Sequence, residues 1–209
     1  LIVKVSYSSL NYKDALSASG NKGVTREYPH TPGIDAVGEV IESNSSDFKT
    51  GEKIIVTGYD LGMNTFGGFV QYISIPANWA IPLPKELSEA EAMSIGTAGL
   101  TAGLCVRKLL MNDLAPDSGD VLVTGASGGV GSVAVMVLSK LGFKVVALTG
   151  KKDQADYLES LGASSVIMRS EMEEPGKPLQ KGIYQGGVDT VGGNILSNFI
   201  SQTSQRGAI

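Results

Sequence analysis

Cysteine and histidine are almost absent from this sequence, since each occurs once in 209 residues. A single cysteine, Cys105, cannot form a disulfide bond within the chain. A single histidine, His30, leaves too few nitrogen and sulfur ligands for a zinc site, so we expect no bound metal. Cys105 stands in an apolar helical stretch and is interpreted as a packing residue. His30, which has prolines close by on both sides, is interpreted as a loop residue.

Excess positive charge and long hydrophobic runs are missing as well. The formal net charge is −4, which provides no basic surface for gripping a nucleic acid backbone. No apolar run approaches the roughly 20 residues that a membrane helix needs, and no secretory signal is recognisable at the start. We therefore expect a cytoplasmic protein that binds neither nucleic acid nor membranes. With 42% hydrophobic residues, the chain can bury a sizeable core.

Both ends of the sequence fall inside expected elements. The sequence begins in Leu1-Ile-Val-Lys-Val5, an alternating run typical of a β-strand, and stops at Gly207-Ala-Ile209, where another apolar segment begins. We therefore expect a piece of a longer protein.

The first part of the chain contains short strand-like runs broken by glycine and proline, at 3–7, 36–43, 53–57, 69–75 and 79–82. This pattern predicts a small, rolled β domain. A helix is expected to follow, because Ser88 with Glu91 three residues later has the spacing of a capping box. The helix runs towards Leu110.

From Asp120 the pattern changes to alternating strands and helices. Continuous apolar strands separated by helices indicate an α/β fold with a parallel sheet covered on both faces. The expected strands are 121–124, 144–149, 165–168, 187–191 and one near 208, and the expected helices are 131–141, 154–161 and 196–203.

A glycine-rich turn connects the first of these strands to the first helix. Gly125, Gly128 and Gly131 are spaced three residues apart, and Gly129 adds a fourth glycine. Glycines at this place let the backbone turn tightly and approach a pyrophosphate, which then sits at the positive end of the helix. The strand-turn-helix context predicts a dinucleotide site, whereas the same glycines elsewhere would mark only a turn.

The end of the second strand indicates which dinucleotide is bound. NAD sites place Asp or Glu there to accept hydrogen bonds from the ribose hydroxyls, but this strand ends in Thr149-Gly-Lys151 and the first carboxylate is Asp153. Lys151 and the Thr149 hydroxyl can bind the additional phosphate of NADP. Arg169 follows the neighbouring third strand and can fork onto the phosphate or stack on adenine. Each cation taken alone is equally well explained as a surface charge, but together they favour NADPH.

Four motifs resemble the medium-chain dehydrogenase/reductase superfamily. The resemblance covers essentially the whole chain and is nearest to the zinc-independent quinone oxidoreductase branch of YhdH/YhfP type, which includes bacterial NADPH-dependent acrylyl-CoA reductases. The motifs are Ser9-Leu-Asn-Tyr-Lys-Asp14, Pro32-Gly-Ile-Asp-Ala-Val-Gly38, Gly96-Thr-Ala-Gly-Leu-Thr-Ala102 and Thr124-Gly-Ala-Ser-Gly-Gly-Val-Gly131.

The resemblance implies an α/β protein with a GroES-like, β-rich catalytic domain at 1–94 and a doubly wound Rossmann NADP-binding domain at 95–209, both incomplete, in a homodimer. Zinc-dependent relatives carry Gly-His-Glu where this chain has Gly33-Ile34-Asp35. Isoleucine cannot ligate a metal, so the resemblance also argues against zinc.

Residue roles follow from the same resemblance. Tyr12 would contact NADPH near the reacting ring, with Asn11 as a second catalytic residue, and Thr101 would pack on the nicotinamide. Alternatively, Asn11, Tyr12 and Asp14 form only a polar turn in which Asp14 caps the next helix. The implied cofactor contacts are Ser127, Gly128, Gly129 and Val130 for the pyrophosphate, and Thr149, Gly150, Lys151 and Arg169 for the 2′-phosphate.

The chemistry expected of such a site is hydride transfer from NADPH to a C=C bond conjugated to a carbonyl. A proton must also reach the α-carbon, from Tyr12 or from water. Acrylyl-CoA is the leading substrate by resemblance, followed by quinones and small enones or alkenals. Two alternatives stay open: a non-catalytic NADPH-binding sensor or structural protein, and a zinc alcohol dehydrogenase.

Overall fold

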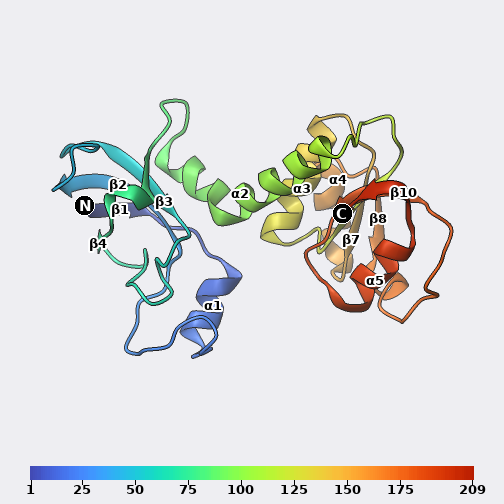
Figure 1. The fold of residues 1–209 in the computed structure, drawn as a ribbon, viewed down its shortest axis with the longest axis horizontal. Helices are drawn as coiled ribbons and strands as arrows, with labels where there is room; N and C mark the ends of the chain where they lie inside the picture. The colour runs from blue at the N-terminus through green and yellow to red at the C-terminus, as the bar shows by residue number, and fades with distance from the viewer. The chain divides into compact units, whose positions relative to one another are not determined.

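A computed structural model describes residues 1–209, and its internal contacts divide the chain into two compact units. Unit 1 comprises Leu1–Thr97 and unit 2 comprises Ala98–Ile209. Figure 1 shows the antiparallel strands of unit 1 and the parallel strands of unit 2. The domain bounds expected from the sequence, 1–94 and 95–209, stay a prediction. The α/β class with one sheet of each kind is confirmed.

Unit 1 contains a five-stranded antiparallel sheet in the order β4-β1-β2-β3-β5. Apolar side chains such as Val3, Val40, Ile54 and Val56 are fully buried in its core. The strands are β1 (Ile2–Tyr7), β2 (Asp35–Glu42), β3 (Lys53–Thr57), β4 (Tyr72–Ser74) and β5 (Ala80–Pro82), accompanied by helix α1 (Tyr12–Ala18) and the 3-10 turn η1 (Ala77–Trp79).

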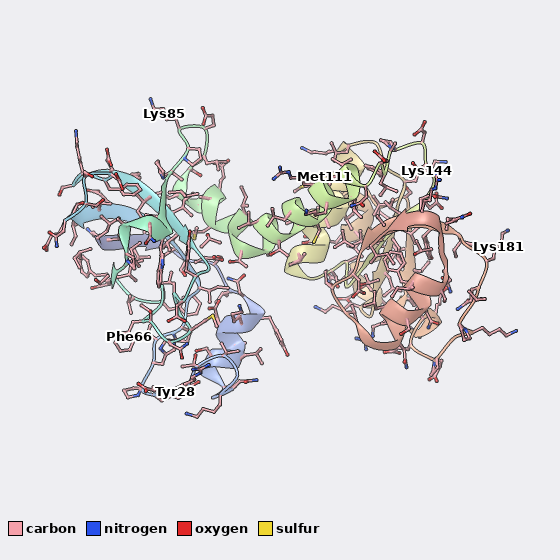
Figure 2. The ribbon with its side chains drawn as sticks, viewed as in Figure 1. Tyr28, Phe66, Lys85, Met111, Lys144 and Lys181 are labelled. Atoms are coloured by element: carbon pink, nitrogen blue, oxygen red, sulfur yellow. The ribbon has the colours of Figure 1, made fainter.

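His30 lies in a loop of unit 1, as expected. Its ring stacks on Phe66 at a centroid distance of 6.0 Å and meets the edge of Tyr28 at 6.4 Å. Tyr28 and Phe66 are labelled in Figure 2. The imidazole is therefore an aromatic packing element, and its Nε2 atom has no hydrogen-bond partner.

Helix α2 (Glu89–Met111) begins with the predicted capping box. The Ser88 hydroxyl accepts the Glu91 amide at 3.2 Å, while the Ser88 amide donates to the Glu91 carboxylate at 2.8 Å. The helix is interrupted at Gly96, whose φ of 48° and ψ of −157° are not helical. Glycine adopts a positive φ without the steric penalty that a Cβ imposes.

Unit 2 contains a five-stranded parallel sheet in the order β10-β9-β6-β7-β8. The strands are β6 (Val121–Thr124), β7 (Val145–Thr149), β8 (Ser165–Met168), β9 (Tyr184–Val188) and β10 (Thr203–Ala208). The helical segments are α3 (Gly129–Lys140), η2 (Lys152–Gln154), α4 (Ala155–Ser160), η3 (Arg169–Glu171) and α5 (Gly193–Ser201).

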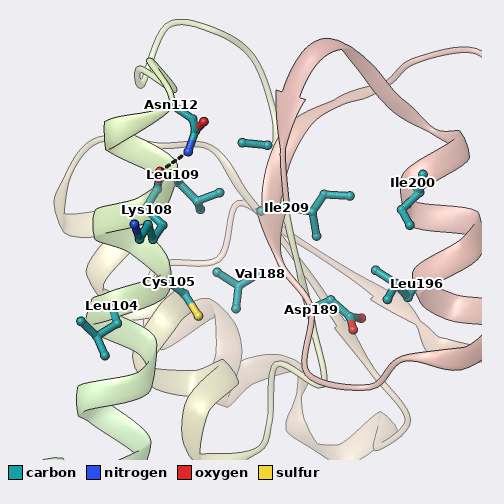
Figure 3. Close-up of a pocket in the computed structure, with 12 residues that line it drawn as sticks. Leu104, Cys105, Lys108, Leu109, Asn112, Val188, Asp189, Leu196, Ile200 and Ile209 are labelled. Atoms are coloured by element: carbon teal, nitrogen blue, oxygen red, sulfur yellow. Dashed lines mark hydrogen bonds between the residues drawn. The ribbon is translucent and has the colours of Figure 1, made fainter.

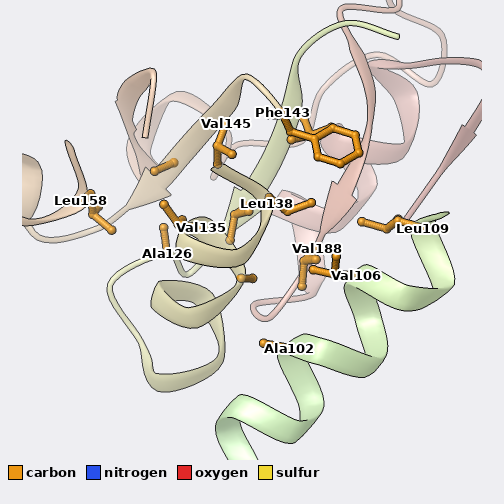
Figure 4. Packing of buried hydrophobic residues seen from close by; sticks show 14 of the residues in the cluster. Ala102, Val106, Leu109, Ala126, Val135, Leu138, Phe143, Val145, Leu158 and Val188 are labelled. Atoms are coloured by element: carbon orange, nitrogen blue, oxygen red, sulfur yellow. The ribbon is translucent and has the colours of Figure 1, made fainter. Parts of the chain in front are cut away.

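Both faces of the parallel sheet are covered, as the continuous apolar strands predict. On β6, Val121 and Val123 pack in the cluster that contains α3 and part of α2, which Figure 4 shows. Leu122 points to the opposite face, where Ile195 and Phe199 of α5 pack. Truncating a fully buried Leu such as Leu122 to Ala costs about 2–5 kcal/mol.

One predicted strand is displaced along the chain. The expected strand 187–191 is β9 at Tyr184–Val188, and residues 189–191 leave the sheet. Gly186 and Gly187 lie inside β9, where glycine is a poor indicator of a strand. A Cβ on Gly187 would overlap the carbonyl of Leu122 on the neighbouring strand, so the close strand pairing requires glycine there.

Candidate functional site

The glycine turn after β6 brings the strand directly against the start of α3. Gly125 has a φ of +59°, and its carbonyl accepts the Gly128 amide at 2.9 Å. Gly128 is the N-cap of α3. A Cβ on Gly131 would overlap the Gly125 carbonyl and lie 2.7 Å from the Ala126 Cα, so the first turn of α3 has no room for a side chain there. The amides of this turn remain close to the helix N-terminus, which favours an anion.

A pocket of about 290 Å³ opens beside this turn. Six residues predicted for the cofactor line it, and no carboxylate does. The lining residues are Gly125, Ser127, Gly128, Leu148, Gly150, Lys151, Arg169 and Val191. The other predicted residues of the turn, Gly129, Val130 and Gly131, belong to the first turn of α3 and do not line the pocket.

Thr149 lies at the end of β7, beneath the pocket surface and not on it. Its side chain is 1% exposed. The Thr149 hydroxyl is 2.9 Å from the Ser127 hydroxyl and accepts the Lys151 amide at 3.1 Å. Thr149 therefore connects the glycine turn to the residues after β7. The sequence predicted that its hydroxyl contacts the 2′-phosphate directly, but the side chain is buried.

The two predicted cations differ in their surroundings. The Arg169 Nε atom is 2.8 Å from a carboxylate oxygen of Glu173, and about half of each side chain is exposed. Lys151 forms no ion pair. The Arg169 guanidinium lies over Gly150, with Cζ 3.4 Å from the position that a Gly150 Cβ would take. Sequence reasoning missed Glu173, whose i,i+4 spacing from Arg169 was the available signal.

Asp189 and Thr190 hold the carboxyl ends of β6 and β9 together, and sequence reasoning missed both. The Thr124 hydroxyl donates to Asp189 at 2.6 Å, and the Thr190 hydroxyl donates to the Thr124 carbonyl at 2.9 Å. A Cβ on Gly125 would overlap the Thr190 hydroxyl oxygen. The glycine turn is therefore supported on one side by the residues that follow β9.

In unit 1, a buried carboxylate gathers the polar residues of two sequence motifs. Asp35 is 0% exposed and accepts the Ser9 hydroxyl at 2.5 Å, the Asn11 side-chain amide at 2.9 Å and the Thr97 hydroxyl at 2.6 Å. It also accepts the Thr97 backbone amide at 2.9 Å, next to the interruption of α2 at Gly96. Sequence reasoning missed Asp35, because the Gly-Ile-Asp motif was considered only for its missing zinc ligand.

The residues predicted near the reacting ring lie at the start of α1, also in unit 1. Asn11 is the N-cap of α1, and Tyr12 follows with 80% of its side chain exposed. Asp14, expected as a cap, lies three residues beyond the N-cap. Its carboxylate accepts the Asn11 amide at 2.8 Å and the Gly33 and Ile34 amides at 3.0 and 2.9 Å. Thr101, the remaining predicted contact, is an exposed residue of α2 in unit 2.

A second, larger cavity of about 600 Å³ occurs in unit 2 between α2, β9, α5 and β10, and Figure 3 shows it. Its lining is mostly apolar and includes Leu109, Val188, Ile200 and Ile209. Cys105 also lines it and is partly buried, which agrees with its interpretation as a packing residue. Because none of the predicted site residues lines this cavity, we do not assign the cofactor to it.

The structure contains neither a candidate metal centre nor a membrane-spanning helix. No group of three His, Cys, Asp or Glu side chains is arranged to hold a metal ion. Ile34, which the resemblance places where a zinc ligand would be, is 3% exposed. None of the helices combines the length and the apolar character that a membrane crossing requires.

An antiparallel unit followed by a parallel sheet with this glycine turn defines the architecture of the medium-chain dehydrogenases and reductases. Residues 1–85 match the alcohol dehydrogenase GroES-like domain. The chain is 47% identical to YhfP of Bacillus subtilis over 100% of its own length, and 46% identical to the acrylyl-CoA reductase AcuI of Ruegeria pomeroyi over 96%. It spans 64% and 61% of those two proteins.

Solved structures give the same result. The yhdH oxidoreductase of Salmonella enterica in complex with NADP matches with a TM-score of 0.96 at 42% identity, over 99% of this chain and 64% of that one. YhfP of Bacillus subtilis with NAD bound matches with a TM-score of 0.94 at 48% identity, over 99% and 63%. The chain therefore belongs to the medium-chain dehydrogenase/reductase superfamily, in its quinone oxidoreductase branch.

Proposed function

We propose that the protein is an NADPH-dependent, zinc-independent reductase that transfers hydride to a C=C bond conjugated to a carbonyl. The observation that carries the proposal is which charged residues line the pocket beside the glycine turn. Lys151 and Arg169 line it together with the turn, and no carboxylate does. A 2′-phosphate is favoured by two cations, whereas a carboxylate at the same place would repel it.

The residues of the pocket fit this cofactor. The lack of space for a side chain at Gly131 keeps α3 close to β6, so that its N-terminus faces a pyrophosphate bound at Ser127 to Val130. Lys151 and Arg169, next to Gly150, would bind the 2′-phosphate. Thr149 would act from below by fixing Ser127 and Lys151. A solved relative with NADP bound supports the assignment, and a second one with NAD bound supports a dinucleotide at this site.

In the proposed reaction, NADPH supplies a hydride to the β-carbon of the substrate, a proton adds to the α-carbon, and NADP⁺ is released. The exposed Tyr12 phenol would donate or relay that proton. Asn11 would hold the start of α1 through its bond to Asp35 and take part in catalysis from there. Thr101 would pack on the nicotinamide.

Substrate identity is the finer part of the proposal. Acrylyl-CoA comes first, since a relative 46% identical to this chain is named an acrylyl-CoA reductase. Quinones come next, because the chain belongs to the quinone oxidoreductase branch, and alkenals follow. The proposal also includes a homodimer in the cytoplasm, and light scattering of the purified protein would give the number of subunits.

An assay of NADPH oxidation by the full-length protein tests the reaction. We expect turnover of acrylyl-CoA, with quinone and alkenal as comparison substrates, and we expect Tyr12→Phe to lower turnover while NADPH affinity is retained. If NADPH binds but none of the three substrates is reduced, the protein is a non-catalytic NADPH-binding protein and the enzymatic proposal is wrong.

Cofactor preference has its own test in Lys151→Asp. The substitution places a negative charge at the 2′-phosphate site, so NADPH affinity should fall at least about tenfold while NADH affinity changes little. Lys152→Asp is the matched control, because Lys152 is the next residue, is exposed and does not line the pocket. Equal losses for both nucleotides in Lys151→Asp would contradict the proposed 2′-phosphate site.

A further inference from the structure

We infer that Glu173 sets how strongly the protein prefers NADPH over NADH, because it forms an ion pair with Arg169, which lines the pocket beside the glycine turn. The inference rests on the proposed function, which assigns this pocket to the 2′-phosphate. Glu173 itself does not line the pocket and would act through Arg169.

The geometry of the ion pair determines which donors of Arg169 are available. The Nε atom donates to Glu173 at 2.8 Å. A guanidinium has five N–H donors, so four remain on the two terminal nitrogens. The group lies over Gly150 on the wall of the pocket. A phosphate can therefore still reach the terminal nitrogens, but the side of the guanidinium that includes Nε is already bound to a carboxylate.

Glu173 is held in place by two asparagines of α5. The Asn194 side-chain amide donates to the Glu173 carbonyl at 3.0 Å. The Asn198 amide donates to the carbonyls on either side, at 2.9 Å to Met172 and 2.8 Å to Glu174. Asn198 is 5% exposed. Three successive carbonyls are thus fixed against one helix, so the backbone that carries Glu173 is anchored despite its exposed side chain.

Neighbouring carboxylates do not share this arrangement. Glu171 accepts the Met168 amide at 2.8 Å and is engaged by the backbone. Glu174 is exposed and forms no ion pair. Within unit 2 the ion pair of Arg169 and Glu173 is the only one. Glu174 therefore has the same charge as Glu173 but forms no ion pair with Arg169, which makes it a matched control.

The sign of the effect follows from the charges. A 2′-phosphate carries a charge near −1.5 to −2 and would compete with the Glu173 carboxylate for the same guanidinium. The 2′-hydroxyl of NADH is neutral and has no such competition. Glu173 therefore reduces the affinity gained from the phosphate and leaves NADH binding nearly unchanged. The pair is half exposed, so solvent screening keeps the effect moderate.

The test is to titrate NADPH and NADH into the full-length protein and to measure the Kd of each nucleotide from nicotinamide fluorescence. Glu173→Gln keeps an acceptor for Arg169 Nε but removes the charge. We expect its Kd for NADPH to fall about fivefold and its Kd for NADH to change less than about 1.5-fold. The matched control, Glu174→Gln, should leave the ratio of the two constants unchanged. At about 0.5 M salt the gain should shrink.

A double-substitution cycle shows whether Glu173 acts through Arg169. In an Arg169→Gln background, Glu173→Gln should no longer tighten NADPH binding. An unchanged gain in that background overturns the inference, as does a Glu173→Gln protein whose ratio equals that of Glu174→Gln or shifts towards NADH. If the unsubstituted protein binds neither nucleotide, the proposed function fails as well. If it binds NADPH and only the Glu173 effects are missing, the inference alone fails.

Discussion

The two units organise their polar residues in opposite ways. In unit 2 the glycine turn is built from backbone, because neighbouring atoms leave no room for side chains at Gly125 and Gly131. In unit 1 the polar cluster works through side chains, because Asp35 accepts hydrogen bonds from Ser9, Asn11 and Thr97. A site made of backbone tolerates many neighbouring residues but no Cβ, whereas a site made of side chains depends on the charge of one buried group.

The largest loss of stability that tests this comparison is expected from a substitution of Asp35. The Asp35 carboxylate accepts hydrogen bonds from four donors. In Asp35→Asn one of its oxygens becomes an NH₂ group, which is itself a donor and therefore cannot accept from the donors that face it. Bonds to a charged group are worth about 1.5–3 kcal/mol each, so we expect the free energy of unfolding of unit 1 to fall by about 3 kcal/mol. Urea unfolding of the full-length protein measures it.

Asp47→Asn is the control for this prediction, because Asp47 is exposed in the same unit and should lose less than about 0.5 kcal/mol. Equal stability of the two variants would show that the charge of Asp35 is not what stabilises the polar cluster.

The next effect concerns the backbone-built turn. Gly131→Ala places a Cβ against the Gly125 carbonyl and the Ala126 backbone, so α3 must move away from β6. Such overpacking costs about 1–3 kcal/mol. We expect about 2 kcal/mol of lost stability together with at least about tenfold weaker NADPH binding, measured by thermal unfolding and by titration.

Gly103→Ala provides the contrast, because a Cβ on Gly103 has no atom within 4 Å and the residue is exposed on α2. Alanine is favoured over glycine in a helix, so this variant should be unchanged or slightly more stable. A Gly131→Ala protein with normal NADPH affinity would refute the idea that this turn excludes side chains for the sake of the cofactor.

The smallest expected effect is a pH dependence of the stability of unit 1, which arises from Glu91. The Ser88 hydroxyl and amide donate to Glu91, and these bonds hold the pKa of its carboxyl below its usual value. A carboxyl whose pKa is lowered by folding stabilises the protein above its unfolded pKa of 4.5 and loses that contribution as the pH falls further. We expect a small loss of stability below about pH 4.5 that is absent in Glu91→Gln. Identical pH profiles for both proteins would contradict it.

The comparison also explains what the sequence could predict. Gly125, Gly128 and Gly131 have a regular spacing, and the capping box of Ser88 and Glu91 spans four residues, so both are legible from local patterns. The strands 53–57, 121–124 and 165–168 were predicted with the bounds that the structure gives. Local patterns succeed where the interacting groups are close along the chain.

The rest depended on contacts between distant residues. Asp35 meets Thr97 across 62 positions, and Thr124 meets Asp189 across 65, so no spacing in the sequence connects them. Burial of Thr149 follows from the packing of the parallel sheet, and no local feature of Thr149-Gly-Lys151 reveals it. The strand near 187 was predicted too far along the chain because it contains two glycines, and these are required by the close approach of β10 at Gly186 and of β6 at Gly187.

The buried Thr149 hydroxyl can influence how Ser127 donates into the pocket. Thr149 accepts the Lys151 amide, so its own hydrogen is free to point at the Ser127 oxygen 2.9 Å away. With its oxygen occupied in this way, Ser127 can turn its hydrogen into the pocket that it lines. When Thr149 is the donor to Ser127, the amide, threonine and serine form a short chain of donors in one direction, and each bond polarises the next. In that arrangement the neutral Ser127 hydroxyl at the pocket surface is a stronger donor to an anion, without any added charge.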